Sequence, residues 1–88
     1  MSVVNTFETE EEALSKANDT EFGLFAAVYT KDISRAIRFA KALEAGGVGV
    51  NCAMALIFSL PFGGWKQSGD GRMWGKPGMD GWLEVCRF

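Results

Sequence analysis

The sequence predicts the α/β fold class, with a helix, strand, helix and strand followed by a glycine-rich loop and a terminal strand. Three observations lead to this prediction. Residues 9–18 and 32–45 each begin with a helix-capping residue and continue with apolar residues at helical spacing. Residues 22–30 and 48–50 are apolar runs with the composition of strands. Glycines punctuate the irregular stretch from residue 63 to residue 81.

Composition narrows the class of function. The chain has 88 residues, 48% hydrophobic and 23% charged, as in one soluble globular unit or a piece of one. It has no histidine, which removes the commonest general base and metal ligand. The two cysteines, Cys52 and Cys86, could form one bridge at most. We therefore expect no metal site and no nucleophile paired with a histidine.

Charge and hydropathy predict the setting. The net charge is −2, and neither half of the chain contains a dense basic run, so we expect no nucleic-acid partner. The longest strictly apolar run, residues 52–58, is too short to cross a bilayer. The N-terminus has no basic region followed by an apolar one. We expect no membrane association and a cytoplasmic location, with the mitochondrial matrix as the alternative.

The first helix has a capping-box signature. Thr9 is the expected N-cap, and Glu12 is placed to reach back over the first turn. Three glutamates in that turn complement the positive end of the helix dipole. The polar residues 18–20 end the helix. The following run, residues 22–30, is apolar throughout, which predicts one strand covered on both faces, as in a parallel sheet.

The second helix begins after Asp32. Its apolar residues share one face from Ile33 to Leu43, and we expect it to continue to about Ala45. The pair Gly46-Gly47 is the predicted stop, before a short strand over residues 48–50. Two helices cannot cover both faces of such a sheet, so much apolar surface would face water. The chain is therefore predicted to be part of a larger domain.

The second half has weaker periodicity. Residues 53–60 are apolar without a clear period, which fits either a buried strand or a loop that lines a cavity. Residues 82–88 are the predicted terminal strand. Cys52 has no neighbouring base or cation, so we expect a buried, inert thiol, and Cys86 is also expected to be structural. The carboxylates Asp70, Asp80 and Glu84 are expected at the solvated surface.

The glycine cluster has only part of the pattern of a phosphate-binding loop. Gly69 and Gly71 begin a G-x-G pattern, but Trp74 stands where the third glycine is needed. Lys66 has no Walker-type glycines before it, and Gln67 replaces the required Ser or Thr. Direct phosphate binding by this loop is therefore disfavoured. If the loop did bind phosphate, the isolated chain would have measurable affinity for nucleotides.

Several stretches resemble one enzyme family, in order and spacing, over nearly the whole chain. They are Phe7-x-Thr-Glu-Glu-Glu-Ala13, Ala17-Asn-Asp-Thr-Glu-Phe-Gly-Leu24, Thr30-Lys-Asp32, Ala45-Gly-x-Val-x-Val-Asn51 and Pro61-Phe-Gly-Gly-Trp-Lys-Gln-Ser-Gly-x-Gly-Arg72. The last run is the most specific. The chain resembles the C-terminal segment of the catalytic domain of the NAD(P)-dependent aldehyde dehydrogenases. The resemblance implies that residues 1–81 belong to that domain and that residues 82–88 begin the terminal oligomerisation strand.

The resemblance also implies roles for particular residues. The nucleophilic cysteine, the general-base glutamate and the cofactor site lie upstream in the family, so no catalytic or cofactor-binding residue is expected here, and Cys52 matches a non-catalytic position. The substrate-tunnel positions are Met54, Leu56 and Phe62. The structural-loop positions are Asn51, Gly63, Gly64, Lys66, Gly69, Gly71 and Arg72, the last matching a buried arginine. The oligomer positions are Trp82, Leu83, Glu84 and Val85.

Three positions depart from the family pattern. Met73 replaces a glutamate linked to proton movement, so a relay through this position is absent. Gly49 stands where a bulky residue is common, which implies a gap or a different packing partner. Lys76-Pro77 lies in a turn that usually holds Glu or an aromatic residue.

We therefore expect the chain to be part of an aldehyde dehydrogenase that oxidises an aldehyde to a carboxylic acid with NAD or NADP. The parent is expected to be a homodimer or homotetramer, and the 88-residue chain alone is expected to be inactive. The alternative from another class is a truncated, non-catalytic module that binds partners through exposed apolar faces and an edge strand.

Overall fold

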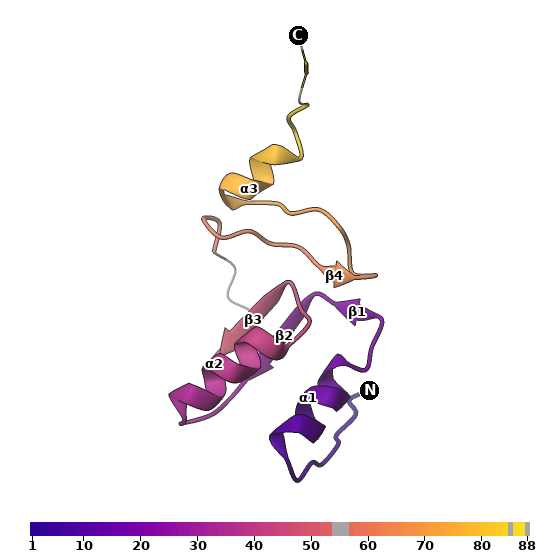
Figure 1. Cartoon of the computed structure of the whole chain (residues 1–88), viewed down its shortest axis with the longest axis vertical. Helices are drawn as coiled ribbons and strands as arrows, with labels where there is room; N and C mark the ends of the chain where they lie inside the picture. The colour runs from indigo at the N-terminus through magenta and orange to yellow at the C-terminus, as the bar shows by residue number, and fades with distance from the viewer. Residues whose placement is uncertain (54–56, 85, 88) are drawn as a thin grey trace.

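A computed structural model describes residues 1–53, 57–84 and 86–87, so Met54, Leu56 and Val85 lie outside the described residues. Figure 1 shows an elongated chain, with α1, α2 and the paired strands β2 and β3 in one half and β4, α3 and the C-terminus in the other. The elements are α1 (Glu10–Asn18), β1 (Phe22–Gly23), β2 (Phe25–Val28), α2 (Ile33–Ala42), β3 (Gly47–Val50), β4 (Trp65–Lys66) and α3 (Gly75–Asp80).

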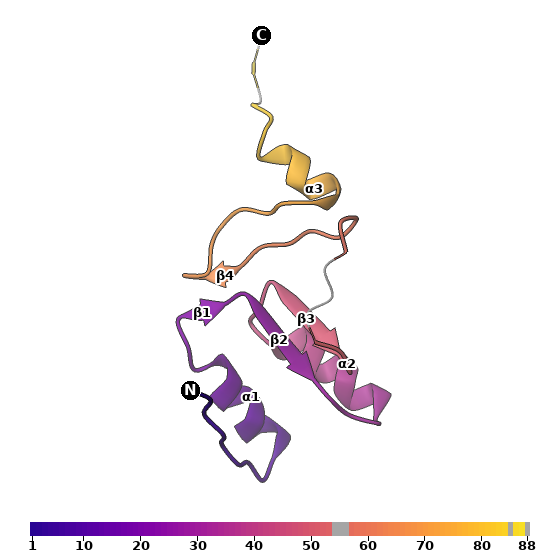
Figure 2. The same cartoon turned by 180° about the vertical axis from the view of Figure 1, so that it is seen from behind.

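The central unit is β2–α2–β3. The two strands pair in parallel, from Phe25 opposite Gly47 to Val28 opposite Val50, and α2 is the connection between them. Figures 1 and 2 show α2 against one face of this sheet. The buried apolar side chains are Val28 on β2, Ala36 on α2 and Leu43 at the C-cap of α2. The predicted α/β class is confirmed.

The first helix begins as its capping residues predict, with one difference. The Thr9 hydroxyl accepts a hydrogen bond from the Glu12 backbone N–H at 3.2 Å. The Glu12 carboxylate accepts from the Glu8 N–H at 3.0 Å, one residue before the expected N-cap partner. The carboxylate of Glu10 also contacts Arg35 and Arg38 of α2 at 2.6 and 2.9 Å. The charged start of α1 is thereby joined to α2.

The prediction of one strand over residues 22–30 is wrong, because the run divides at Leu24. β1 pairs antiparallel with β4, whereas β2 pairs in parallel with β3. The Gly23 N–H donates to the Ser68 hydroxyl at 2.9 Å, so the chain at this point serves the glycine-rich loop rather than the parallel ladder. Pairing with β4 and Ser68, which lie more than 40 residues later in the sequence, divides the strand at Leu24. The apolar run itself does not indicate these partners.

The second helix ends three residues before the predicted end at Ala45. Leu43 is an extended C-cap. The Ala42 carbonyl would accept from the Gly46 N–H if the helix continued. It accepts instead from the Asn18 side-chain amide at 2.9 Å, and the Gly46 N–H donates to the Gly23 carbonyl at 2.9 Å. Tertiary hydrogen bonds therefore end the helix before its glycine stop.

The C-terminal region also differs from expectation. The glycine-rich stretch contains a short helix, α3, with Lys76 and Pro77 in its first turn, where proline is tolerated. The predicted strand over residues 82–88 does not form between described residues of this chain. The Trp82 and Leu83 N–H groups instead donate to the Met79 and Asp80 carbonyls, continuing the turn after α3.

Much apolar surface faces water, as expected. The accessible surface is 7310 Å², roughly 2,200 Å² more than the ~5,100 Å² of a compact protein of 9.6 kDa. The radius of gyration is 15.6 Å, against about 12 Å for a compact domain of this length. Phe22, Tyr29 and Ile33 are all more than half exposed. Among the described residues, α2 covers one face of the β2–β3 sheet, while these large apolar side chains stay exposed.

Both cysteines are exposed, which corrects the expectation that Cys52 is buried. Cys52 follows β3 beyond Asn51, whose backbone is left-handed with φ 53°, and the described residues leave the Cys52 side chain exposed. Between the described residues, no helix is long and apolar enough to cross a membrane.

Candidate functional site

The glycine-rich loop, residues 61–72, is fastened to the first half of the chain by backbone pairing. β4 lies within it and pairs with β1, with Phe22 opposite Lys66 and Gly23 opposite Trp65. The Gln67 N–H donates to the Glu21 carbonyl at 2.9 Å. The loop therefore begins from a fixed edge and is not a free linker.

Lys66 reinforces this attachment with its side chain. Its ammonium donates to the Asn18 carbonyl at 2.8 Å and the Thr20 carbonyl at 3.0 Å, at the C-terminal end of α1. It also pairs with the Glu44 carboxylate at 2.5 Å. Two carbonyls and one carboxylate thus surround one charge, and they come from both α1 and the end of α2. Lys66 joins three segments that are distant in sequence.

Two contacts explain why glycines are needed. A Cβ on Gly46 would lie 1.7 Å from the Gly63 carbonyl oxygen, and a Cβ on Gly64 would lie 2.5 Å from the Ser68 Cβ. Neither position has room for a side chain, because one backbone passes directly over the other. Gly69 and Gly71, by contrast, have no atom within 4 Å of an added Cβ. The close approach therefore lies at the base of the loop.

Arg72 closes the loop. Its guanidinium Nη1 donates to the Gly64 carbonyl at 2.8 Å and to the Gly71 carbonyl at 2.9 Å. Gly64 directly precedes β4, and Gly71 lies near the end of the glycine-rich loop. One charged group therefore joins the two ends of this part of the loop. Arg72 is half-buried in this chain, less than the family resemblance implies.

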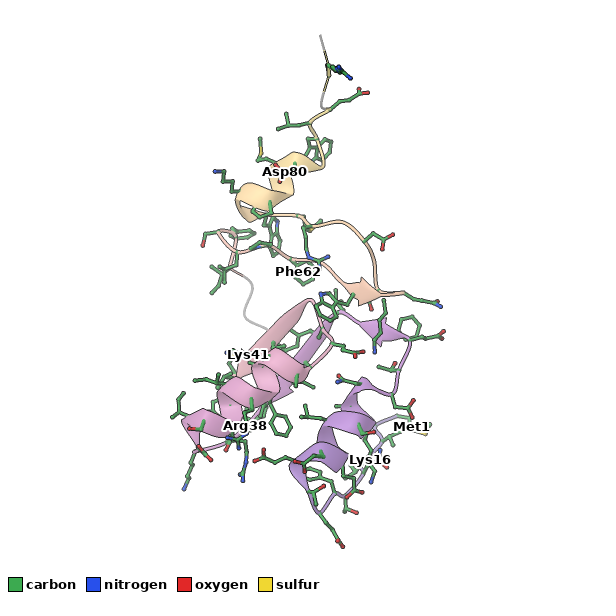
Figure 3. The ribbon with its side chains drawn as sticks, in the orientation of Figure 1. Met1, Lys16, Arg38, Lys41, Phe62 and Asp80 are labelled. Atoms are coloured by element: carbon green, nitrogen blue, oxygen red, sulfur yellow. The ribbon has the colours of Figure 1, made fainter. Side chains whose placement is uncertain are left out.

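Phe62 is positioned by an isolated antiparallel bridge to Met73. Each residue donates its N–H to the other's carbonyl at 2.8 Å. The Phe62 ring lies 5.3 Å from the Trp74 ring between centroids, and the Phe58 ring contacts the same indole edge-on at 4.9 Å. Figure 3 shows Phe62 between the C-terminal half and the β2–β3 sheet.

A cleft of about 570 Å³ separates the loop from this sheet. Its walls are mainly apolar, with few polar groups, as in sites for small molecules. The sheet side includes Phe25 and β3, and the loop side includes Leu60, Phe62 and Trp74. Phe25 also approaches Gly49, where an added Cβ would lie 2.9 Å from the ring. The Phe25 ring therefore occupies the space beside Gly49 that a side chain at this position would need.

The strongest electrostatic contacts lie away from this cleft. Hydrogen bonds from Arg35 and then Arg38 lower the pKa of the Glu10 carboxyl, and Lys16 lowers that of Glu12. Both glutamates are on α1, so these shifts describe helix attachment rather than acid–base chemistry. In residues 1–53, 57–84 and 86–87, no cluster of His, Cys, Asp or Glu could hold a metal ion.

The predicted site residues lie in several separate places. Phe62 lines the cleft, while Gly63, Gly64, Lys66 and Arg72 hold the loop in place. Asn51 is elsewhere, and its side-chain amide exchanges hydrogen bonds with the Thr30 backbone at 2.8 and 3.0 Å. Trp82, Leu83 and Glu84 are exposed beyond α3. Met54, Leu56 and Val85 fall outside the described residues.

Sequence reasoning missed Trp74 as a cleft residue. In the sequence, Trp74 stands out only as the residue that breaks a glycine fingerprint. The available signal was an aromatic side chain beside Gly75, next to a loop already rich in aromatics.

Comparison with known proteins gives a consistent set of matches. Residues 1–87 match the model of the aldehyde dehydrogenase family. The chain is 49% identical over 82 residues to the chloroplastic betaine aldehyde dehydrogenase of Atriplex hortensis, covering 93% of this chain and 16% of that protein.

Two solved structures are also similar. One is the betaine aldehyde dehydrogenase of Staphylococcus aureus in complex with NAD⁺, with TM-score 0.86 and 46% identity. The other is an aldehyde dehydrogenase of Brucella melitensis biovar abortus 2308, with TM-score 0.85 and 52% identity. In both, the match covers 89% of this chain and 16% of the other. The chain spans about one sixth of the length of the proteins it matches.

Proposed function

Because this chain belongs to the aldehyde dehydrogenase family, we propose that it acts as the C-terminal portion of an enzyme that oxidises aldehydes to carboxylic acids. Its contribution is part of the substrate tunnel and part of the oligomer contacts. The observation that carries this proposal is the family match over residues 1–87, on a chain that spans 16% of the relatives' length. The excess apolar surface supports it, because a larger catalytic domain would cover that surface.

The cofactor of the proposed enzyme is NAD or NADP, which supplies a hydride acceptor when bound. The glycine-rich loop of this chain does not fit a dinucleotide. Gly69 and Gly71 stand in open space, and the third glycine of a phosphate-binding turn is replaced by Trp74. The cofactor site, the nucleophilic cysteine and the general base are therefore assigned to the remainder of the enzyme.

The proposed role of the loop is to hold an apolar wall in a fixed place. Lys66 and Arg72 tie the loop backbone to α1 and to itself, and Phe62 projects from the held segment into the cleft. Met54 and Leu56 are proposed to extend the same wall. A wall of this kind selects aldehydes by shape and excludes water, while the reacting groups come from the remainder of the enzyme.

The proposed oligomer contact uses Trp82, Leu83, Glu84 and Val85. Trp82 and Leu83 are 87% and 67% exposed, an unusual state for large apolar side chains. Pairing of this segment with a sheet of another subunit would cover these two side chains. A homodimer or homotetramer is the corresponding proposal. The cytoplasmic location stays a prediction, and the Atriplex relative is named as chloroplastic.

The proposal is tested with a chimaera in which these 88 residues replace the matching segment of the Staphylococcus aureus enzyme. We expect the purified chimaera to reduce NAD⁺ in the presence of an aldehyde, measured by absorbance at the NADH band. The 88-residue chain alone should give no NADH, because the proposal assigns the nucleophilic cysteine and the cofactor site to the remainder of the enzyme. The control is the Staphylococcus enzyme truncated before the segment, which should be inactive.

Two results would contradict the proposal. One is a chimaera that forms a folded oligomer but reduces no NAD⁺ with any aldehyde. The other is robust turnover by the 88-residue chain alone.

The exposed apolar faces favour a second candidate, a non-catalytic module that binds partners. Both outer edges of the two-stranded β2–β3 sheet are unpaired among the described residues, and such edges recruit other strands. Mass spectrometry of the protein from its native cells separates the two functions. A product about six times the 9.6 kDa of this chain favours the enzyme, and one near 9.6 kDa favours the module.

A further inference from the structure

The starting observation is the backbone of Trp74, which has φ 63° and ψ 165°. This region is essentially restricted to glycine, because a Cβ crowds the neighbouring peptide there. Residues held in such conformations are over-determined by their surroundings and gather at ligand-binding sites. A tryptophan here therefore needs a structural cause.

Backbone hydrogen bonds on both sides provide that cause. Before Trp74, the Met73 N–H and carbonyl exchange two bonds of 2.8 Å with Phe62. After it, the Gly75 N–H donates to the Phe58 carbonyl at 3.0 Å. The residues on either side of Trp74 are thus fastened to the two ends of segment 58–62, and the indole is held against that segment.

The indole contacts the two aromatic rings of this segment. Its centroid lies 5.3 Å from the Phe62 ring, with an interplanar angle of 33°, and 4.9 Å from the Phe58 ring, at 71°. Both separations are within the range of favourable aromatic pairs. Phe58 is 74% exposed, so this cluster is not a closed hydrophobic core. Trp74 and Phe62 both line the 570 Å³ cleft that faces β3.

From this arrangement we propose that Trp74 is a specificity-determining positioning residue, whose indole sets the tilt of the Phe62 ring and thereby the width of aldehyde admitted to the cleft. The inference rests on the proposed function, in which Phe62 is a wall of the substrate tunnel. Trp74 acts through Phe62 and needs no contact with the reacting atoms. The strained backbone is consistent with this role, because the hydrogen bonds of Met73 and Gly75 hold it beside the Phe62 ring.

The experiment uses the chimaera, with acetaldehyde as the narrow probe and benzaldehyde as the wide one. The variants are Trp74→Leu, which removes the ring, and Trp74→Phe, which keeps an aromatic ring. Both retain a Cβ, so the demand on the backbone is the same. Trp65→Leu is the matched control, because the Trp65 side chain is exposed and does not line the cleft of Phe62 and Trp74. Phe62→Ala tests the wall itself.

We expect Trp74→Leu to raise the benzaldehyde-to-acetaldehyde ratio of kcat/KM by roughly 10-fold, the scale of a small change in an apolar pocket. The change should lie in KM for benzaldehyde, with kcat for acetaldehyde unchanged. Trp74→Phe should keep the ratio within about 3-fold of the value for the unsubstituted chimaera. Trp65→Leu should leave the ratio unchanged.

Different results overturn the two proposals separately. If Phe62→Ala changes the ratio and Trp74→Leu does not, the role of Trp74 is wrong and the tunnel wall stands. If neither changes it, the wall at Phe62 is also wrong. Where Trp74→Leu does not fold, a benzaldehyde-to-acetaldehyde ratio raised by up to about 3-fold in Trp74→Phe, with kcat for acetaldehyde unchanged, supports positioning by the ring, and an identical ratio overturns it. Equal losses of kcat for both aldehydes with that variant overturn it. The same graft in the Brucella enzyme provides a second host.

Discussion

The α/β unit, residues 9–51, and the loop segment, residues 57–84, are held by different kinds of interaction. In the α/β unit, capped helices and a parallel strand pair account for most of the structure, and the buried side chains Val28, Ala36 and Leu43 all lie there. In the loop segment, single side chains and close backbone contacts replace a core. Lys66 and Arg72 bind carbonyl oxygens, and the base of the loop passes directly over Gly46.

This difference shows how a loop can be well placed without a core of its own. Each attachment of the loop segment ends on the α/β unit or on the loop itself, so its position depends on the unit beneath it. Substitutions in the loop should therefore affect the α/β unit little. Substitutions at the joint, where the base of the loop passes over Gly46, should displace the loop. Three substitutions in the chimaera test that asymmetry.

The largest effect is expected at the joint. Gly46→Ala would place a Cβ 1.7 Å from the Gly63 carbonyl, so the two backbones must separate. We expect a loss of about 3 kcal/mol or more in the free energy of unfolding, at the upper end of overpacking effects, together with loss of aldehyde oxidation. Urea unfolding and NADH formation measure the two losses. Gly71→Ala, which meets no atom within 4 Å, should change stability little, and an equal loss in both variants would contradict the steric explanation.

A smaller effect is expected within the loop. Arg72→Met keeps the aliphatic stem but removes the bonds to the Gly64 and Gly71 carbonyls. Hydrogen bonds that involve a charged group contribute about 1.5–3 kcal/mol, so we expect a loss of that order. Hydrogen exchange should rise in residues 61–72 and stay unchanged in α2. Faster exchange throughout α2 would show that the loop supports the α/β unit, contrary to the comparison.

The smallest effect is expected in the α/β unit, at Glu10. Arg35 and Arg38 lower the pKa of this carboxyl below the ordinary 4.5, so the pairing stabilises the fold above about pH 4.5 and is lost as the pH falls through the lowered value. Glu10→Gln should therefore lower the urea midpoint slightly at pH 7, and the difference should shrink below pH 4.5. Glu11→Gln, at the exposed neighbouring position, is the control. A difference that grows in acid would contradict the pairing.

Sequence reasoning predicted the α/β unit better than the loop segment, for a physical reason. Helix caps and amphipathic spacing act within a few residues, so Thr9 and Asp32 mark the two helix starts correctly. The break at Leu24 and the early end of α2 depend on Ser68 and Asn18, which lie at least 24 residues away in sequence. No local pattern contains those partners. The exposure of Cys52 was also not predictable from its sequence neighbours, because burial depends on whether other parts of the structure cover the side chain.

By itself, the sequence determined the fold class, the family and the starts of both main helices, because those features depend on local spacing and on specific motifs. Tertiary structure alone decided where strands divide, where α2 ends and which aromatic side chains meet in the wall of the cleft. The run from Phe62 to Trp74 shows both contributions. Its motif identifies the family, but only the folded chain brings Trp74 against Phe62, because two backbone hydrogen bonds between Phe62 and Met73 join the ends of an eleven-residue separation.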